Sequence, residues 1–361
     1  MSRDLPLREN AEFDVIALGS VMFRLSSEQI PLVAANSLQL FHGGAAYNFV
    51  YAMKRTFGYD TAFLSALPAN PPGDALYRRM LESGADLRWV KHCEAKPEGP
   101  RLGINWTDSG FGNRPPISHA DRAGEALGFL DASDFALREI FQQKGCRWFH
   151  ADGITPGLSD RSPALTYDIL TAAKTSGAIV SYDLNYRHAV WKTRGGSEGA
   201  SQVNRKNLQQ VDVLFAGVGN LVTALGMDGW QDAQRLYSFD ESAELVEAVA
   251  QEFPHLKAIA VTWRNEIRAN LHELGALLWY QGAVHTIEPA PFQVLDRVGS
   301  GDAFDAGVAA GIFSDLSANE ILHQGRALSA HSLTTAGDLV RAAGVSELAP
   351  FLTQARVRIE R

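Results

Sequence analysis

The nonapeptide DRVGSGDAF, residues 296–304, combines residue types suited to the chemistry of an anion. Gly299, Ser300 and Gly301 leave their backbone N–H groups unshielded, just before a segment with the small and apolar residues of a buried helix. A helix N-terminus favours negative charge, so these groups suit a phosphate oxygen. The anion would repel the Asp302 carboxylate, unless that group takes a proton from an attacking hydroxyl. The alternative is a glycine turn in which Asp302 caps the helix.

A second glycine pair opens the stretch HGGAAYNFVYAMKRTFG, residues 42–58, which has the pattern of an amphipathic helix. Gly43 and Gly44 allow a sugar to approach the backbone closely, and Asn48 offers an amide about one turn further on. The alternative is a structural turn with a buried asparagine that the backbone satisfies.

Polar residues also follow the strand-like run GAIVSYDLN, residues 177–185. In the segment DLNYR, Asp183, Asn185 and Arg187 stand at alternate positions, so they share one face if the strand continues. An arginine at such a place can pair with a carboxylate or a phosphate through two hydrogen bonds. A surface salt bridge is the alternative.

These motifs belong to a chain in which strand-like and helix-like segments alternate. Apolar runs lie at residues 14–25, 147–153, 177–185, 211–217 and 257–263, and helical patterns such as 162–177 and 241–253 lie between them. This alternation predicts an α/β fold, with a mostly parallel central sheet and helices on both faces. Such sheets bind ligands beyond the carboxyl ends of their strands, where the motifs stand.

Two turn-rich regions interrupt the alternation, at about residues 23–41 and 99–121. They contain β-like pieces with no helix after them, so we expect a small β lid on one main domain that spans residues 13–361. Residues 1–12 are polar and charged, and we expect a disordered tail there. The glycine-rich stretch 192–207 is the candidate for a mobile surface loop.

Composition argues against several classes of function. The formal net charge of -8 at pH 7 opposes nucleic-acid binding, which requires a basic surface. The two cysteines are too few for a disulfide framework or a zinc cluster, which fits a reducing compartment. The sequence shows no secretory signal and no apolar run of membrane-spanning length, so we expect a cytoplasmic protein without a membrane partner. No G-x-G-x-x-G follows the first strand, which disfavours a nucleotide-binding oxidoreductase.

Three segments together resemble the ribokinase-like, or pfkB-type, carbohydrate kinases. DRVGSGDAFDAG resembles the C-terminal signature of that family and GGAAYN its N-terminal glycine signature. DLNYR, with Trp191 after it, is similar to the branch that phosphorylates 2-keto-3-deoxygluconate. The resemblance extends from about residue 15 to residue 352, nearly the whole chain.

The resemblance implies that ATP, with Mg²⁺, phosphorylates a hydroxyl of a sugar or sugar acid. Asp302 would be the base, while Gly299, Ser300, Gly301 and Arg187 would stabilise charge on the transferring phosphoryl group or on the substrate's acid end. The substrate-binding residues would be Gly43, Gly44, Asn48, His119, Asp121, Arg187 and Asp302. The nucleotide-binding residues would be Asn185, Thr262, Arg264, Asn265, Gly299, Gly301 and His331. Lids of this family often pair edge to edge, which predicts a homodimer through the lid.

The chain departs from the family pattern at three places. Where the family has an Asn-x-x-Glu sequence tied to the metal, Gly217 and Asn220 stand instead. An amide is a poorer Mg²⁺ ligand than a carboxylate, so the metal ligands are left unassigned. Ala120 replaces a tyrosine in the lid, and Ser20 replaces a glutamate after the first strand. A neutral-sugar kinase such as a fructokinase or ribokinase, and a non-catalytic sugar or nucleotide sensor, therefore remain as alternatives.

Overall fold

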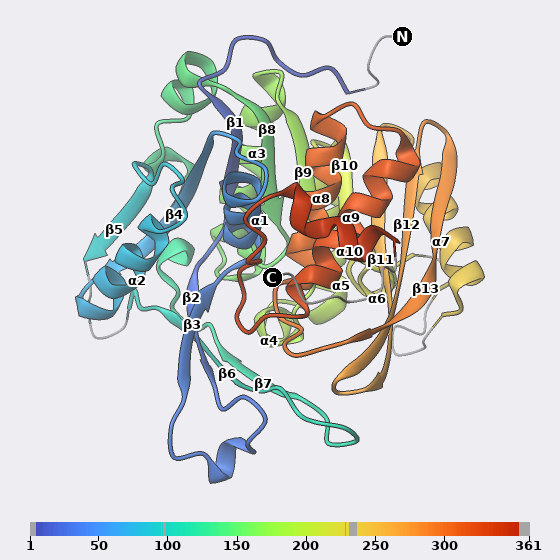
Figure 1. Cartoon of the computed structure of the whole chain (residues 1–361). Coiled ribbons are helices and arrows are strands. Elements are labelled where there is room, and N and C mark those ends of the chain that lie inside the picture. Colours follow the sequence, from blue (N-terminus) through green and yellow to red (C-terminus); the bar gives the residue numbers. More distant parts are fainter. Residues whose placement is uncertain (1–4, 95, 97–98, 228, 231–236, 354–361) are drawn as a thin grey trace.

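The computed structural model describes residues 5–94, 96, 99–227, 229–230 and 237–353 (Figure 1). At its centre lies a nine-stranded sheet of order β13-β12-β11-β10-β9-β8-β1-β4-β5. The strands are β1 Phe13–Leu18, β4 Thr61–Ala69, β5 Val90–Glu94, β8 Cys146–Asp152, β9 Ile179–Asp183, β10 Val213–Gly217, β11 Ala258–Arg268, β12 Leu271–Tyr280 and β13 Ala283–Gln293. Neighbours from β5 to β11 run parallel, and β12 and β13 add two antiparallel strands at one edge. The predicted mostly parallel sheet is confirmed.

Helices cover both faces of this sheet because its strands are apolar on both sides (Figure 1). In β1, Val15 and Ala17 face one helical layer, and Ile16 and Leu18 face the other. The first layer holds α1 Ala45–Arg55, α2 Pro71–Leu81, α8 Ser300–Phe313 and α9 Ala318–Ser332, with α10 Ala349–Thr353 against α9. The second layer holds α3 Ser162–Thr175, α5 Gly196–Leu208, α6 Val218–Leu225 and α7 Phe239–Glu252.

Shorter helices occupy the connections. These are α4 His188–Trp191, the 3-10 turns η1 Leu32–Ala34, η2 Ala126–Phe129, η3 Ala132–Asp134, η5 Thr155–Gly157 and η6 Val345–Leu348, and the π-helix η4 Arg138–Lys144. Among the described residues, none of the helices has both the length and the apolar character that a membrane span requires.

A separate four-stranded sheet, of order β3-β2-β6-β7, forms the lid that projects from the carboxyl edge of the large sheet (Figure 1). Its strands are β2 Met22–Ser26, β3 Gln39–Gly43, β6 Gly103–Asp108 and β7 Ile117–Asp121. The single apolar run expected at residues 14–25 was wrong, because it contains two strands that belong to different sheets. The chain leaves the large sheet at Gly19, whose Cα is so close to Ala46 that a Cβ would lie 2.8 Å from the alanine side chain.

The lid contacts the main body at two places far apart. At its root, Arg24 of β2 pairs with Asp296 and Asp338, at 2.6 Å and 2.7 Å. At its far end, the loop between β6 and β7 bonds to the turn between β11 and β12. There the Ala269 N–H donates to the carbonyl of Gly112 at 2.9 Å, and the Gly112 N–H donates to Asn270 Oδ1 at 3.1 Å.

Two further expectations differ from the structure. Within the expected tail, residues 5–12 lie against the main domain: Leu5 is buried in the core, and the Arg8 guanidinium donates to the Phe141 carbonyl at 2.7 Å. Residues 1–4 of that tail lie outside the described part of the chain. The expected loop at residues 192–207 is largely helix α5, because Ala200, Asn204 and Asn207 form a buried face on it.

Candidate active site

A cavity of about 500 Å³ lies between the lid and the carboxyl ends of the large sheet's strands. The lid side contributes Met22, Asn105, Ser118 and Arg122, and the opposite side contributes the ends of β10 and β11 and the start of α8. The residues discussed in the sequence analysis that line the cavity are Gly44, Asn48, Asp183, Asn185, Arg187, Gly217, Asn220, Thr262, Arg264, Gly299, Ser300, Gly301 and Asp302. Five segments far apart in the chain therefore meet at one place.

The first turn of α8 has the geometry of an anion site. Gly299 is the N-cap with a φ of 83°, and a Cβ there would lie 1.9 Å from the Asp338 carbonyl oxygen, so no larger residue fits. A Cβ at Gly301 would meet no atom within 4 Å, which leaves the backbone open to a ligand. Arg264 donates to the Ser300 hydroxyl at 2.5 Å and brings positive charge to the same helix end.

Asp302 is directed at a neighbouring helix and not at its own backbone. Its Oδ2 accepts a hydrogen bond from Asn48 Nδ2 at 2.6 Å, and α8 has no side-chain cap bond. The Asn48 Oδ1 accepts in turn from the Gly44 N–H at 3.3 Å. Burial raises the pKa of Asp302 to about 7, although the Asn48 bond and the charge of Arg187 act in the opposite direction. The contact with Asn48 thus favours the interpretation as a base over that as a cap, and the raised pKa lets the carboxyl exchange a proton near neutral pH.

Two more carboxyls lie close to Asp302. Asp183, at the end of β9, and Asp305, one turn further along α8, are both buried. Burial, with the charge of Asp302 added to it, raises the pKa of Asp183. Burial and the charges of Asp183 and Asp302 hold the pKa of Asp305 well above its ordinary value. The group of three therefore carries fewer than three negative charges at neutral pH.

The residues after β9 reach the cavity without continuing the strand. The strand ends at Asp183, and Asn185 has a φ of 31°, which turns the chain. The expected shared strand face at Asp183, Asn185 and Arg187 is therefore wrong, although all three line the cavity. The Asn185 N–H donates to Asp183 Oδ1 at 3.1 Å, and this local bond stabilises the turn.

Four arginines line the cavity and make it attractive to anions. Arg122 follows the lid strand β7, and Arg187 follows β9 with its side chain exposed to solvent. Arg264 lies at the opposite end, where burial lowers its pKa to about 10, so it keeps its charge at neutral pH. Arg297 pairs with Glu266, which lines the cavity too.

Two expected substrate residues lie on the wrong face of the lid. In β7, Ser118 lines the cavity, so the alternation of a strand directs His119 to the outer face. His119 is exposed and pairs in register with Trp106 of β6. Asp121 is also exposed and forms an ion pair with Arg101 at 3.0 Å.

Three other expected residues do not line the cavity. Asn265 donates to Glu273 at 2.9 Å across the β11–β12 pair. His331 faces Glu347 at 3.8 Å and the ring of Phe351. Gly43 is buried, and a Cβ there would lie 2.6 Å from that of Asp338, so it gives room to the cavity wall.

Several lining residues were assigned no role from the sequence. They are Met22, Asn105, Ser118, Arg122, Asp305 and Asp338, together with Glu266 and Arg297. Arg122 directly follows Asp121, which the resemblance had placed among the substrate-binding residues. Strand alternation was the signal that could have found Ser118, once the register of β6 against β7 was known.

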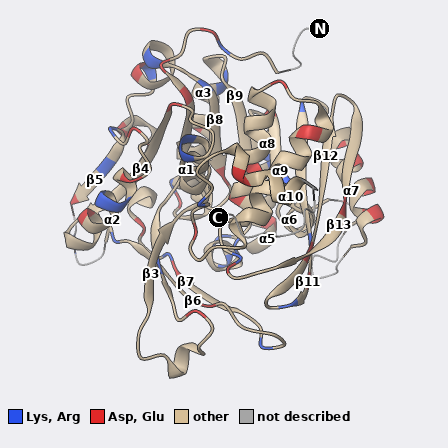
Figure 2. Ribbon diagram, in the orientation of Figure 1, with Lys and Arg blue, Asp and Glu red and all other residues tan. Residues whose placement is uncertain are grey.

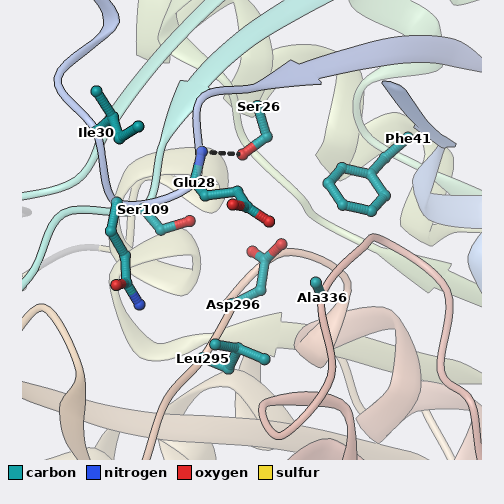
Figure 3. A pocket seen from close by; sticks show the side chains of 9 residues that line it. Ser26, Glu28, Ile30, Phe41, Ser109, Leu295, Asp296 and Ala336 are labelled. Atoms are coloured by element: carbon teal, nitrogen blue, oxygen red, sulfur yellow. Dashed lines mark hydrogen bonds between the residues drawn. The ribbon is translucent and has the colours of Figure 1, made fainter. Parts of the chain in front are cut away.

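A second cavity, of about 250 Å³, lies at the lid root and shares no lining residue with the first (Figure 3). Figure 3 shows the carboxylates of Glu28 and Asp296 directed toward one another, with Phe41 and Leu295 on opposite sides. The Glu28 side chain accepts from Gln39 at 2.6 Å, and Asp296 pairs with Arg24. Both carboxylates are thus already paired with neighbouring side chains.

Comparison with known proteins gives concordant matches. The model of the pfkB family of carbohydrate kinases matches residues 12–341. The chain is 26% identical over 329 residues to a 2-dehydro-3-deoxygalactonokinase from Haloferax volcanii, covering 90% of this chain and 92% of that one. The crystal structure of a 2-dehydro-3-deoxygluconokinase from Thermotoga maritima matches with a TM-score of 0.84 and 28% identity, over 94% and 99% of the two chains. A fructokinase from Xylella fastidiosa, solved with bound ATP, shares the fold with a TM-score of 0.70 and 19% identity, over 94% and 98%.

Proposed function

The chain belongs to the pfkB family of carbohydrate kinases, and we propose that it transfers the γ-phosphoryl group of ATP to a hydroxyl of a six-carbon keto-deoxy sugar acid such as 2-keto-3-deoxygluconate. The membership confirms the resemblance drawn from three sequence motifs and excludes the oxidoreductase alternative. The names of the relatives, which specify dehydro-deoxy sugar acids, support this substrate class. The fructokinase with bound ATP supports the donor.

One observation carries the choice of an acid over a neutral sugar. Arg122 and Arg187 come from the lid and from the end of β9, yet both line the cavity that holds Asp302. A guanidinium matches a carboxylate in shape and can bind it through two hydrogen bonds. A neutral sugar offers these guanidinium groups only hydroxyl oxygens, which are weaker partners than a carboxylate.

The proposed reaction assigns each end of the cavity a role. Asp302 takes the proton of the attacking hydroxyl, whose oxygen bonds to the γ-phosphorus while the bond to ADP breaks. The N–H groups at the start of α8, with Arg264, stabilise the charge on the transferring group. Asn48 and Gly44 hold the sugar, and Thr262 and Asn185 hold the nucleotide.

Mg²⁺ would arrive with ATP. In the described part of the chain no group of three or more His, Cys, Asp and Glu side chains could hold a metal ion. Mg²⁺ prefers substrate phosphates, waters and one or two protein oxygens, and the amide of Asn220 in the cavity wall offers one. The metal would neutralise charge on the phosphates. The residues present fit this role, because the cavity wall offers the amide oxygen of Asn220 and the phosphates and waters would supply the other ligands.

A coupled assay of ADP release over a panel of sugars and sugar acids tests the proposal. We expect the highest kcat/KM on the keto-deoxy acid, and we expect Arg187→Ala to lower turnover of the acid more than that of fructose. Arg101→Ala, which removes an exposed lid arginine outside the cavity, is the control. A higher kcat/KM on fructose or ribose would establish the neutral-sugar kinase, and ATP binding without turnover of any acceptor would establish the sensor.

We further propose a homodimer that pairs through the outer face of the lid. Leu40, Leu25, Trp106 and His119 form a row of neighbours across its four strands. Leu40 and Trp106 are 39% and 37% exposed, and Ile117 beside them is 50% exposed. The lid ribbon carries few charges (Figure 2), so a second lid would cover an apolar surface.

A further inference from the structure

Three parts of the chain surround the guanidinium of Arg122. Its Nη1 donates to the Ser20 hydroxyl at 3.1 Å and to the Glu125 carboxylate at 3.1 Å and 3.4 Å. Ser20 lies between β1 and β2, and Glu125 comes directly before η2. Within the described residues all bonds of this guanidinium use Nη1, so Nη2 and Nε are left for a ligand in the cavity.

The Glu125 side chain fills a buried space beside Arg122. Its side chain is 3% exposed, against 10% for that of Arg122. A Cβ at Gly103 would lie 2.2 Å from Glu125 Oε1, so the glycine in β6 leaves the space that the carboxylate fills. The neighbouring buried carboxylate, Asp152, already accepts from the backbone N–H groups of Ile154 and Thr155. Glu125 is therefore the carboxylate available to Arg122.

We infer that Glu125, together with Ser20, is a positioning residue for substrate selectivity, because it holds the Arg122 guanidinium in the orientation that receives the acid group of the substrate. This inference rests on the proposed sugar-acid substrate. Glu125 does not line the cavity and touches no substrate, so it acts only through Arg122.

The physical reason is the freedom of an arginine side chain. Arginine has several rotatable bonds, and fixing them at the moment of binding costs affinity. A buried carboxylate that holds Nη1 beforehand fixes the plane of the guanidinium and thus the direction of its other donors. Loss of this partner should weaken ground-state and transition-state binding of the acid together, which raises KM and leaves kcat.

Glu125→Gln is the decisive variant, because it keeps the shape of the side chain and removes its charge. We expect KM for 2-keto-3-deoxygluconate to rise about tenfold, with kcat nearly unchanged and KM for fructose unaffected. Asp212→Asn is the matched control: it removes a buried carboxylate that pairs with Lys174 outside the cavity, so it should lower stability without changing the ratio of the two KM values. An equal change on acid and fructose, or no change on either, overturns the inference.

A second pair of variants tests whether a carboxylate supplied from Ser20 can replace that of Glu125. In Glu125→Ser the acid preference should fall, and Ser20→Glu added to it should restore that preference, because Ser20 already contacts Nη1. A folded double variant that remains as unselective as Glu125→Ser contradicts the inference. If the wild-type protein itself shows no preference for the acid, the proposed function fails, whereas the inference fails alone when the wild type is selective and Glu125→Gln is equally so.

Discussion

At the scale of single residues, Asp302 and Asp305 make an informative contrast. They lie one turn apart on α8, and burial raises the pKa of both. Asp302 is half-buried at the cavity wall and bonded to Asn48, whereas Asp305 is buried beneath it. A group with a pKa near 7 can accept a proton at neutral pH, whereas the raised pKa of the more deeply buried Asp305 favours its protonated form.

Asp302→Asn should therefore lower kcat by about 10²–10⁴, because the amide keeps the contact with Asn48 but cannot accept a proton. Calorimetry should show ATP and sugar still binding. Asp305→Asn is the comparison on the same helix, and we expect a smaller loss of kcat because Asp305 is buried beneath Asp302. Near-normal turnover of Asp302→Asn would remove it from the mechanism.

The same carboxyl gives the wild type a pH dependence. Turnover requires ionised Asp302, so kcat/KM should rise with pH and level off above about 7, the pKa to which burial raises it. The sign for stability is opposite. Because the folded-state pKa lies above the unfolded value, ionisation of Asp302 costs folding free energy as the pH rises through this range. At pH 8 the melting temperature of Asp302→Asn should thus equal or exceed that of the wild type.

The site could be predicted from sequence only where its residues stand in contiguous motifs. Residues 299–302 and the Gly44–Asn48 pair could be predicted, because a glycine turn directly before a helix places these residues near one another whatever the rest of the fold. The lid residues could not be placed in that way. A strand presents alternate residues to opposite faces. While the register is unknown, the sequence cannot tell whether His119 or Ser118 faces the cavity. Structure assigns Ser118 to the cavity.

At the scale of elements, the ion cluster of Arg24, Asp296 and Asp338 joins the lid to the phosphate end of the site. The three side chains are between 1% and 6% exposed. Asp296 also accepts from the N–H groups of Val298 and Gly337, so it holds the loop that leads into Gly299. A strand of the lid therefore helps to set the geometry at the start of α8.

Replacement of Arg24 should reveal this coupling. Arg24→Met leaves two buried carboxylates without their partner, which should cost on the order of 3–5 kcal/mol in the free energy of unfolding. Urea titration measures that loss. Arg24→Lys keeps the positive charge on a single ammonium group. We expect this variant to fold but to have a lower kcat, because one ammonium cannot hold both carboxylates as the planar guanidinium does. Wild-type turnover in Arg24→Lys would show that charge alone suffices.

The elements themselves followed from the sequence wherever the apolar pattern was simple. The strands from β8 to β11 and helices α3 and α7 were expected from alternating apolar runs. Helix α5 was missed because its buried face is made of asparagines: Asn204 accepts from the Tyr182 hydroxyl at 2.8 Å, and Asn207 donates to it at 3.2 Å. A polar face satisfied by hydrogen bonds resembles a loop in sequence.

At the scale of the whole molecule, the outer lid face is the surface that we propose to pair with a second copy. Trp106→Arg places a charge in the middle of its row of side chains and should give the mass of a single chain by light scattering at micromolar concentration. Leu81→Arg changes a more exposed leucine on α2, away from the lid, and should leave the mass unchanged. A wild-type protein that is already monomeric at that concentration contradicts the proposed dimer.

The lid is attached to the main body at both of its ends. It should therefore move less freely than a lid that is attached at a single hinge. Its root is held by buried ions, and its far end by the hydrogen bonds of Gly112 with Ala269 and Asn270. Hydrogen bonds between loops yield before a buried ion cluster does. Opening should therefore begin at the far end, next to the turn between β11 and β12, and the lid should bend about its root. The rate at which ligands dissociate would then depend on the β6–β7 loop and the β11–β12 turn, although none of Gly112, Ala269 and Asn270 lines the cavity.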